Sequence, residues 1–325
     1  MQIEVLESGL AVSIQDLGRI GFYRYGIPMG GAMDRESLKI ANLLVGNEEN
    51  AACFEAPFLG PKLRFEDHRR IAVTGGEVSI KVDGREFRTW EAITVEAGSV
   101  VEFGFIESGA RLYISVSGGL NVPVVLNSRS TYTIGALGGF KGRLLQSGDL
   151  IPLSEINVDV DEKNRRLPFN LIPKINEPTD IRVLPGLYWH RLTSASGESF
   201  FRDAWTVATE ADRMGYRFGG GNKIDFVERK QPFGAGSDPW NIVDSPYPYG
   251  SIQIPGGTEP IVLHRDAVSG GGYFQVGAVI SSDMDIIGQL QPNKIVNFVK
   301  VTMEEALVAR RQKNTRMDQI RQILI

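Results

Sequence analysis

The spacing of apolar residues predicts two short strands and then a helix at the start of the chain. Ile3 and Val5, and then residues 11–14, are expected to form strands separated by a Ser-Gly turn. Asp34 is a good N-cap, and Gly46 follows the last apolar position as a stop signal. Between them the apolar side chains recur at the spacing of one helix face, at Leu38, Ala41, Leu44 and Val45. The pattern predicts a helix between Asp34 and Gly46.

From about residue 71 to residue 116 the period changes from 3.6 to 2. Apolar side chains alternate with polar ones in four successive runs, at Val78, Ile80 and Val82, at Ile93 and Val95, at Val101 and Phe103, and at Leu112, Ile114 and Val116. Asp83-Gly84 is a hairpin signal, and further Gly-containing turns separate the later runs. This region predicts a meander of half-buried strands, which is typical of a barrel or sandwich.

The second half of the chain is also expected to be rich in strands. Residues 154–180 are crowded with charges and carry prolines at 168, 173 and 178, so we interpret 156–180 as a linker. A β-rich region runs from Ile181 to about Thr302, and Thr302 with Glu305 forms a capping box that begins a C-terminal helix. We therefore expect a mainly β protein with a few short helices, divided into 1–155, the linker and 181–325, with interleaving of the halves left open.

Two short motifs recur in both halves. Arg19-Ile20-Gly21-Phe22 resembles Arg213-Met214-Gly215-Tyr216, and residues 117–119 share Ser-Gly-Gly with residues 269–271. We interpret the echo as an old duplication, which would place two related barrels around a pseudo-two-fold axis.

Composition narrows the function classes. The 325 residues include 37 glycines, 35 basic and 39 acidic residues, for a net charge of −4, so we expect no nucleic-acid partner. The single cysteine, Cys53, excludes an internal disulfide, and the three histidines show no metal-ligand spacing. No stretch approaches the roughly 20 apolar residues of a membrane span, and the acidic N-terminus is unlike a signal peptide. We expect a cytoplasmic protein without a membrane segment or a bound metal.

Four stretches combine glycines with arginines and carboxylates: 13–47, 127–152, 209–220 and 265–283. Arginine forks and glycine-rich backbone suit anions, and a buried carboxylate can orient an amide or act as a base. No Walker A motif, nucleophile elbow or zinc signature is present. Structural ion pairs are the simpler interpretation of each Arg-Asp pair, and Cys53 and His264 are most simply packed side chains. The residues alone thus predict a two-part β protein with an anion or amide site.

At these stretches the chain resembles the allophanate hydrolase subunit 2 family, also called the biotin-dependent carboxyltransferase or KipA family, which includes one of the subunits of prokaryotic 5-oxoprolinase. The motifs run in family order from about residue 13 to residue 300. They read QDLGRIGFYRYGIPMGGAMD, ANLLVGN, FLGPKLRF, SGGLNVPVVLNSRST, GGFKGRLLQSGDLIPL, RVLPG, ADRMGYRFGG, GSIQIPGGTEPIVL and SGGGYF. The resemblance implies two cyclophilin-like β-barrels.

The resemblance also implies partners and three branches of function. The leading hypothesis is the KipA-like subunit of an ATP-dependent 5-oxoprolinase, which opens the lactam of 5-oxoproline to glutamate. A KipI-like subunit (allophanate hydrolase subunit 1) and a LamB/YcsF-type subunit would be its partners, ATP with magnesium would act at the level of the complex, and a homo-oligomer is left open. One alternative is a non-catalytic module that antagonises a KipI-type kinase inhibitor. Another is a carboxyltransferase for a urea-like amide, which alone would require biotin.

The chain departs from the family pattern in two places. The usual Ser-Glu-Gly segment is replaced by the longer GAGSDPWNIVDSPYPYG, with Ser237-Asp238 in its place. The usual Gln-Thr-Thr-Gly-Gly-Tyr reads Ala267-Val268-Ser269-Gly270-Gly271-Gly272-Tyr273, without the glutamine. If that glutamine contacts the substrate in the family, this chain handles a different substrate or none.

The motif positions and their chemistry together predict the site residues, in a cleft formed by the opening segment and the 266–273 loop. We expect Asp16, Arg19, Asp34 and Asp266 to act on the lactam. Arg129 and Arg213 are expected to neutralise a carboxylate or phosphate. The other expected substrate contacts are Gln15, Tyr25, Ser130, Thr131, Gly271, Gly272 and Tyr273.

Overall fold

The computed structural model describes residues 1–156, 165–174 and 177–324. The chain forms two compact units that exchange segments. Unit 1 comprises Met1–Ile20, Gly30–Pro173 and Thr315–Ile325, and unit 2 comprises Gly21–Met29 and Lys174–Asn314. Much of the predicted linker, at 157–164 and 175–176, lies outside the described residues. Each unit is therefore treated by itself.

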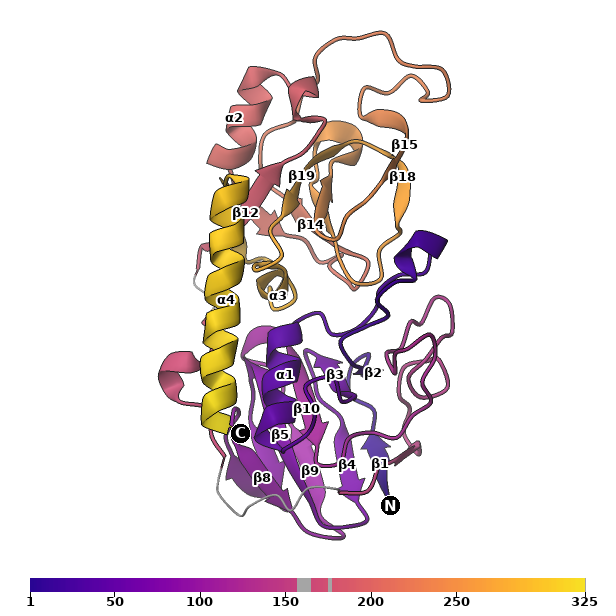
Figure 1. The fold of residues 1–325 in the computed structure, drawn as a ribbon, viewed down its shortest axis with the longest axis vertical. Helices are drawn as coiled ribbons and strands as arrows, with labels where there is room; N and C mark the ends of the chain where they lie inside the picture. The colour runs from indigo at the N-terminus through magenta and orange to yellow at the C-terminus, as the bar shows by residue number, and fades with distance from the viewer. Residues whose placement is uncertain (157–164, 175–176, 325) are drawn as a thin grey trace. The chain divides into compact units, whose positions relative to one another are not determined.

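Unit 1 contains two antiparallel sheets (Figure 1). The six-stranded sheet has the order β11-β1-β4-β9-β6-β7. Its strands are β1 (Gln2–Glu7), β4 (Lys62–Phe65), β6 (Ile80–Val82), β7 (Arg85–Phe87), β9 (Val100–Phe103) and β11 (Leu150–Pro152). The predicted hairpin joins β6 to β7. Its two turn residues, Asp83 and Gly84, both adopt the positive φ that this turn requires, at 49° and 80°.

The second sheet of unit 1 has five strands in the order β2-β3-β10-β5-β8. They are β2 (Ser13–Gln15), β3 (Cys53–Pro57), β5 (Arg69–Glu77), β8 (Ala92–Val95) and β10 (Ser108–Val116). Apolar side chains from both sheets form one buried cluster that includes Val5, Phe54, Phe65, Val101 and Ile114. The apolar residues of the period-2 runs predicted for 71–116 face into this cluster, because alternate side chains of a strand point to the same side of the sheet.

The helix predicted after Asp34 is α1 (Arg35–Leu44), which packs on β5 and β10. Asp34 is its N-cap and accepts a hydrogen bond from the Ser37 amide at 2.9 Å. Ala32, Leu38, Ala41, Cys53 and Tyr113 form a second buried cluster under the helix. The predicted helix and its cap are confirmed.

Unit 2 is built on a closed seven-stranded barrel in the order β12-β19-β16-β17-β14-β13-β20. The strands are β12 (Thr179–Pro185), β13 (Ala204–Val207), β14 (Gly215–Gly219), β16 (Ser251–Gln253), β17 (Ile261–Leu263), β19 (Gln275–Val279) and β20 (Ile295–Lys300). Aromatic rings of Phe200, Trp205, Phe218 and Phe298 pack against one another, with Phe200 and Phe298 stacked at 5.0 Å. A separate two-stranded sheet pairs β15 (Asn241–Pro246) with β18 (Gly270–Tyr273).

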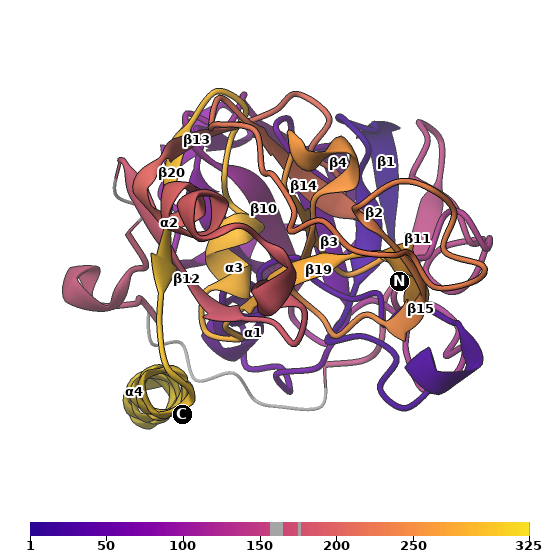
Figure 2. The same cartoon turned by 90° about the horizontal axis from the view of Figure 1, so that it is seen from above.

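Helical segments complete the two units. Helix α2 (Ser194–Arg202) lies beside β20 (Figure 2). It was not predicted, because its Ser-Ala-Ser-Gly start is a weak helix former. Helix α4 (Met303–Leu324) starts at the predicted capping box, where the Thr302 amide donates to Glu305 at 2.7 Å and the Glu305 amide donates to Thr302 Oγ1 at 3.2 Å. The remaining short segments are α3 (Met284–Ile287), η1 (Tyr23–Tyr25), η2 (Phe169–Leu171), η3 (Trp189–Arg191) and η4 (Pro255–Gly257).

The mainly β class with few helices is confirmed. One closed barrel is present in unit 2, whereas unit 1 has two sheets. The two motifs that recur in both halves do not form equivalent elements, so the prediction drawn from them was wrong in this respect. Gly215 begins strand β14, but Gly21 lies in a turn with φ of 98° before η1. Likewise Gly118 and Gly119 turn with positive φ, while Gly270 begins β18. Glycine permits both conformations, so matching Gly motifs need not share a structure.

Candidate functional site

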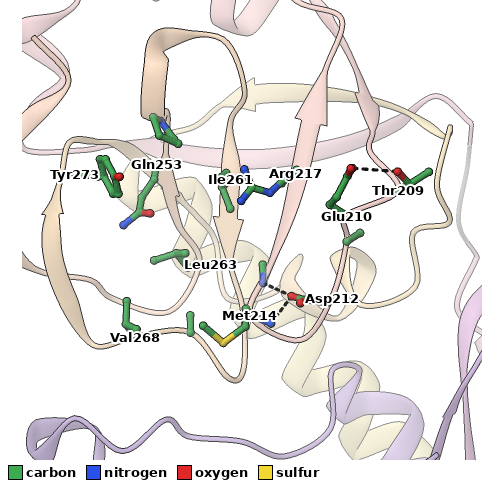
Figure 3. A pocket seen from close by; sticks show the side chains of 14 residues that line it. Thr209, Glu210, Asp212, Met214, Arg217, Gln253, Ile261, Leu263, Val268 and Tyr273 are labelled. Carbon is green, nitrogen blue, oxygen red and sulfur yellow. Dashed lines mark hydrogen bonds between the residues drawn. The ribbon is translucent and has the colours of Figure 1, made fainter. Parts of the chain in front are cut away.

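The candidate site is a pocket of about 780 Å³ in unit 2 (Figure 3). Its size falls within the roughly 300–1,000 Å³ that is usual for small-molecule sites. Strands β14, β16, β17 and β18 supply one part of the lining, and the 209–214 turn supplies another. The lining residues are Thr209, Glu210, Ala211, Asp212, Met214, Gly215, Arg217, Gln253, Pro255, Ile261, Leu263, Ala267, Val268 and Tyr273.

Polar groups with different chemistry converge on this pocket. Gln253 at the end of β16 supplies a carboxamide, and its side chain is 7% exposed. Arg217 supplies a half-exposed guanidinium that lies 3.8 Å from the Glu259 carboxylate. This ion pair is exposed to solvent and therefore weak, so the guanidinium can also bind a ligand. Leu263 and Val268 supply apolar surface. The pocket can therefore hold a small polar molecule with an amide and an anionic group.

The turn at one end of the pocket is held by Asp212. Its carboxylate accepts hydrogen bonds from the Met214 amide at 2.7 Å and the Gly215 amide at 3.2 Å. These bonds shape the turn that leads into β14 and so position Arg217, two residues further on. Glu210 accepts a hydrogen bond from the Thr209 hydroxyl at 3.0 Å.

Two tyrosines brace the β18 side of the pocket. The Tyr247 hydroxyl accepts from the Tyr273 amide at 2.7 Å and lies 3.1 Å from the Tyr273 carbonyl oxygen, to which it donates. The Tyr23 hydroxyl lies 2.9 Å from the carbonyl oxygens of both Tyr247 and Val268. Burial raises the pKa of Tyr23 and of Tyr247, so both remain donors at neutral pH. The bracing holds Tyr273, whose side chain is 45% exposed, at the pocket edge.

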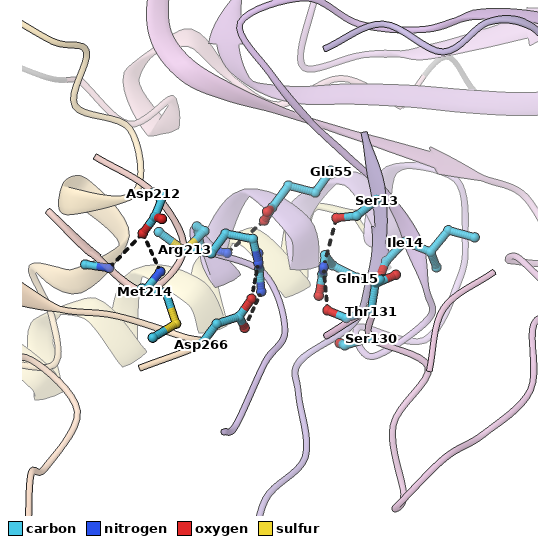
Figure 4. Close-up of polar contacts among 12 residues, drawn as sticks. Ser13, Ile14, Gln15, Glu55, Ser130, Thr131, Asp212, Arg213, Met214 and Asp266 are labelled. Atoms are coloured by element: carbon cyan, nitrogen blue, oxygen red, sulfur yellow. Dashed lines mark hydrogen bonds and ion pairs between the residues drawn. The ribbon is translucent and has the colours of Figure 1, made fainter. Parts of the chain in front are cut away.

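Arg213 and Asp266 form a bidentate ion pair in unit 2 (Figure 4). Arg213 Nε donates to Asp266 Oδ2 at 2.8 Å and Nη2 donates to Oδ1 at 3.1 Å. The Asp266 amide also donates to the Arg213 carbonyl oxygen at 2.9 Å. The pair therefore joins the start of β14 to the segment after β17, next to Ala267 of the pocket lining.

Asp16 is the centre of a buried hydrogen-bond cluster in unit 1. Its Oδ1 accepts from the Gly18 amide at 2.8 Å, from Ser128 Oγ at 2.7 Å and from Ser130 Oγ at 2.5 Å. Its Oδ2 accepts from the Arg129 amide at 2.6 Å. Asp16 is 2% exposed, so these four donors replace the water that the carboxylate loses on folding.

The neighbours of Asp16 extend the same cluster (Figure 4). Gln15 Nε2 donates to Ser13 Oγ at 2.9 Å and to the Thr131 carbonyl oxygen at 3.1 Å. Arg19 is fully buried, and its Nη2 donates to the Ser130 carbonyl oxygen. These hydrogen bonds thus connect residues 15–19 to residues 128–131.

Asp34 belongs to a third set of contacts, also in unit 1. Besides capping α1, it accepts a hydrogen bond from the Ser37 hydroxyl at 2.5 Å. Its amide donates to the Tyr113 hydroxyl at 2.7 Å, and that hydroxyl donates to Glu55 at 2.8 Å. Burial, followed by the charges of Glu55 and Asp34, raises the pKa of Tyr113 well above its usual value.

The structure thus sorts the predicted site residues into separate groups. Tyr273 lines the pocket, Arg213 and Asp266 lie beside it, and Gly271 and Gly272 belong to β18. Tyr25 is 65% exposed in η1. The others lie in the two unit 1 clusters: Gln15, Asp16, Arg19, Asp34, Arg129, Ser130 and Thr131. Their catalytic and binding roles, and the cleft predicted to contain them, stay predictions.

The residue-based prediction missed several members of the pocket. Gln253 and Arg217 are the main ones, and Tyr23 and Tyr247 are the braces. Gln253 does lie in one of the quoted motifs, GSIQIPGG, and its amide breaks an apolar run, which is a usable signal. Among the described residues, no group of three His, Cys, Asp or Glu side chains is arranged to hold a metal ion. No helix in the described part of the chain has the length and apolar character to cross a membrane.

A mainly β chain with a barrel and a small-molecule pocket is the class that fold and site define. A family model described as carboxyltransferase domain, subdomain A and B, matches residues 25–300. The chain belongs to this family.

Relatives of known name span two kinds of enzyme. The chain is 32% identical to a 5-oxoprolinase subunit of Haemophilus influenzae, across 99% of this chain and 98% of that protein. It is 33% identical to urea amidolyase of Saccharomyces cerevisiae, across 94% of this chain but 17% of that much longer protein.

Two solved structures share the fold of this chain. Urea amidolyase of Kluyveromyces lactis superposes with a TM-score of 0.90 at 33% identity, covering 98% of this chain and 20% of that one. The protein TTHA0988 superposes with a TM-score of 0.78 at 27% identity, covering 92% of this chain and 56% of that one.

Proposed function

We propose that this chain is the KipA-like subunit of an ATP-dependent 5-oxoprolinase, which opens the lactam of 5-oxoproline to glutamate. The observation that carries the proposal is the match with the 5-oxoprolinase subunit of Haemophilus influenzae, which extends over nearly all of both chains. The 5-oxoprolinase subunit of Escherichia coli is matched in the same way, at 32% identity over 98% of this chain and 97% of that protein.

The chemistry of the unit 2 pocket supports this substrate. 5-Oxoproline is a five-membered lactam that carries a carboxylate. The Gln253 carboxamide offers an NH₂ donor group and a carbonyl acceptor, which match the carbonyl and N–H of a lactam. Arg217 offers a guanidinium for the carboxylate, and Leu263 and Ile261 offer apolar contact for the ring methylenes. Lactam opening requires energy from ATP, and none of the pocket residues resembles a nucleotide-binding motif.

The chain is accordingly proposed to act within a complex. A KipI-like subunit and a LamB/YcsF-type subunit are the proposed partners in the cytoplasm, with ATP and magnesium bound at the level of the complex. Two cyclophilin-like β-barrel domains related by a pseudo-two-fold axis, and a homo-oligomeric state, remain predictions that accompany this proposal.

The proposal is tested by reconstituting the chain with its two partner subunits and measuring glutamate release from 5-oxoproline with and without ATP. ATP-dependent release that requires this chain is the expected result. Asp16→Ala and Asp266→Ala are each expected to reduce release. Undiminished release in both variants would show that neither carboxylate acts in the reaction, and no release by a fully assembled complex would overturn the function itself.

Carboxyl transfer to a urea-like amide is the second candidate, and a specific observation favours it. The chain superposes on urea amidolyase of Kluyveromyces lactis with a TM-score of 0.90 over 98% of its length. This candidate predicts that the chain binds free biotin or carboxybiotin. Calorimetric titration with biotin distinguishes the two, because saturable biotin binding is expected only for the carboxyltransferase.

A further inference from the structure

Tyr247 is a buried tyrosine whose hydroxyl bonds the backbone at the edge of the unit 2 pocket. The residue after β18, Phe274, donates its amide to the Trp240 carbonyl oxygen at 2.9 Å, on the side of β15. The Tyr273 amide instead donates to the Tyr247 hydroxyl at 2.7 Å, and the Tyr273 carbonyl oxygen accepts from the same hydroxyl at 3.1 Å. Because Tyr247 is 1% exposed, water does not compete for these bonds.

The hydrogen-bonding capacity of this hydroxyl can be counted. A tyrosine hydroxyl has one proton to donate and two lone pairs that accept. The proton goes to the Tyr273 carbonyl oxygen, and the Tyr273 amide uses one lone pair. One lone pair is left, so any further hydrogen-bond partner of Tyr247 has to be a donor.

That further partner is the carboxamide of Gln253. Burial raises the pKa of Tyr247, and smaller effects lower it, among them a hydrogen bond with the Gln253 side chain. A hydrogen bond lowers the pKa of a phenol when the partner donates, because an N–H stabilises the phenolate form. The count and the direction of this effect agree that the Nε2 group of Gln253 faces Tyr247. The oxygen Oε1 would there meet a hydroxyl whose proton is already used.

The other groups of the Gln253 carboxamide are available to a ligand. Gln253 lines the pocket, and Figure 3 shows its carboxamide pointing into it. In the part of the chain that the structure describes, this carboxamide has no hydrogen-bond partner besides Tyr247. Gln275 on β19 differs, because its Oε1 accepts from Ser251 Oγ at 3.0 Å and its Nε2 donates to the Pro246 carbonyl oxygen at 3.0 Å.

Neighbouring segments hold the Tyr247 phenol in place. The Tyr23 hydroxyl lies 2.9 Å from the carbonyl oxygens of Tyr247 and Val268. On β18, a Cβ on Gly271 would lie 3.1 Å from Cε2 of Tyr247 and 3.2 Å from its hydroxyl oxygen. Glycine at this position therefore gives the ring the room to lie close to the strand.

We propose that Tyr247 is a positioning residue, which holds the Gln253 carboxamide so that Oε1 accepts a hydrogen bond from an N–H of the bound ligand. The ligand class is a small amide with an N–H beside its carbonyl group, such as a lactam. In a lactam ring the N–H and C=O point to the same side, so the free N–H of Gln253 would donate to the lactam carbonyl. The inference rests on the proposed function, because it names the part of the substrate that the same pocket recognises.

The test compares two ring compounds that differ at one position. 5-Oxoproline carries the lactam N–H, and its lactone analogue, 5-oxotetrahydrofuran-2-carboxylate, carries a ring oxygen there. Calorimetry measures the Kd of each compound for the complex reconstituted with the two partner subunits, without ATP. The parent complex is expected to bind the lactam about tenfold more tightly than the lactone, because the ring oxygen would face Oε1 with no proton between them.

Tyr247→Phe removes the hydroxyl and keeps the ring. The Gln253 carboxamide can then turn over and offer its NH₂ group to the ring oxygen of the lactone, so the preference for the lactam is expected to fall to about threefold or less. Tyr23→Phe is expected to lower the preference by a smaller factor, since it weakens the hold on Tyr247 without removing its hydroxyl. Tyr188→Phe is the matched control and is expected to keep the parent preference. Tyr188 is a partly buried tyrosine of unit 2 outside the pocket lining.

The ratio of the two Kd values is the deciding measurement, because a general loss of stability would weaken the binding of both compounds together. The inference is overturned if the parent complex binds both compounds equally, or binds neither with a Kd below about 10 mM. It is also overturned if Tyr247→Phe keeps the full preference or, should that variant not fold, if Tyr23→Phe keeps it. Glutamate release is measured separately with ATP. A parent complex that shows the expected preference but releases no glutamate would overturn the proposed function and leave the role of Tyr247 in place.

Discussion

At the scale of single residues, most carboxylates that looked catalytic have a full set of protein partners. Asp16 accepts four hydrogen bonds, Asp34 caps a helix, and Asp266 is paired with Arg213. Buried acids need such partners in any fold, so their presence by itself does not indicate catalysis. Gln253 differs, because its largely buried carboxamide lines the pocket.

Gln253→Ala therefore tests the pocket directly. If the Gln253 carboxamide binds the lactam, its removal raises the KM for 5-oxoproline in the reconstituted complex by about tenfold, the value of one hydrogen bond of about 1.4 kcal/mol. Gln312→Ala, at an exposed position of α4, is the control and is expected to leave KM unchanged. Equal KM values in both variants would remove Gln253 from the substrate site.

Asp16→Asn tests the buried cluster in unit 1. The amide group would face either the Arg129 amide or the three donors on Oδ1, so at least one donor loses its acceptor. We expect the free energy of unfolding to fall by about 2–4 kcal/mol, measured by urea denaturation. Asp212→Asn is the control, because Asp212 is exposed and accepts from two backbone amides only. A loss below that of the control would contradict the structural role.

At the scale of elements, glycines decide how closely segments approach. Gly138 and Gly139 adopt φ of 64° and 57° where the 138–142 turn crosses residues 130–131. A Cβ on Gly138 would lie 2.1 Å from the Ser130 carbonyl oxygen and 2.4 Å from Arg19 Nη2. The density of glycines in this stretch therefore reflects a close backbone crossing.

Gly138→Ala and Gly84→Ala form a matched pair for this interpretation. Both positions have positive φ, but a Cβ on Gly84 would meet nothing within 4 Å. Gly84→Ala is expected to cost about 1 kcal/mol from backbone strain alone. Gly138→Ala is expected to cost about 3 kcal/mol or more, since overpacking adds to the strain. Thermal denaturation of the two variants measures the difference, and equal losses would show that the crossing is loose.

At the scale of the whole molecule, the path of the chain joins the two units repeatedly. Residues 21–29 belong to unit 2 although unit 1 surrounds them in sequence, and α4 contributes residues to both units. Because the units share segments, we treat the free energy of unfolding as a property of the complete chain. Its dependence on pH reports on buried groups that titrate.

The alkaline limit of stability is one such property. Burial, and then the charges of Glu55 and Asp16, raise the pKa of the Cys53 thiol well above its usual value of 9.0. The folded state keeps this proton while the unfolded state releases it, so stability is fully present below pH 9 and is lost as the pH rises further. From pH 8.5 to pH 10 we expect Cys53 to contribute a loss of about 1 kcal/mol in urea denaturation.

Cys53→Ser keeps a similar volume without a group that titrates in this range. It is expected to flatten the pH dependence between 8.5 and 10 by that amount, whatever its effect on stability at pH 7. A slope equal to that of the parent chain would show that the thiol is not responsible. Tyr113, whose pKa is also raised by burial, adds to the loss only at still higher pH.

Elements whose physics is local could be predicted from neighbouring residues. The N-cap at Asp34, the capping box at Thr302 and Glu305, the Asp83-Gly84 turn and the period-2 runs all depend on neighbours within a few residues, and all are present as predicted. The motif order also pointed to the family that the model match identifies. The Arg-Gly echo failed because glycine conformation depends on distant contacts as well as on its neighbours.

The location of the chemistry depends on long-range packing. Closing the barrel brings Arg217 of β14 and Gln253 of β16 to one pocket, and the separate β15–β18 sheet adds Tyr273. Asp16 meets Ser128 and Ser130 across more than one hundred residues, and Arg191 meets the Pro239 carbonyl across 48. Such contacts depend on how the strands of a sheet or barrel pack together. The spacing of residues along the sequence does not determine this packing. Local sequence therefore fixes the elements and indicates the family, whereas the packing of distant segments fixes which polar groups are satisfied and which are open to a ligand.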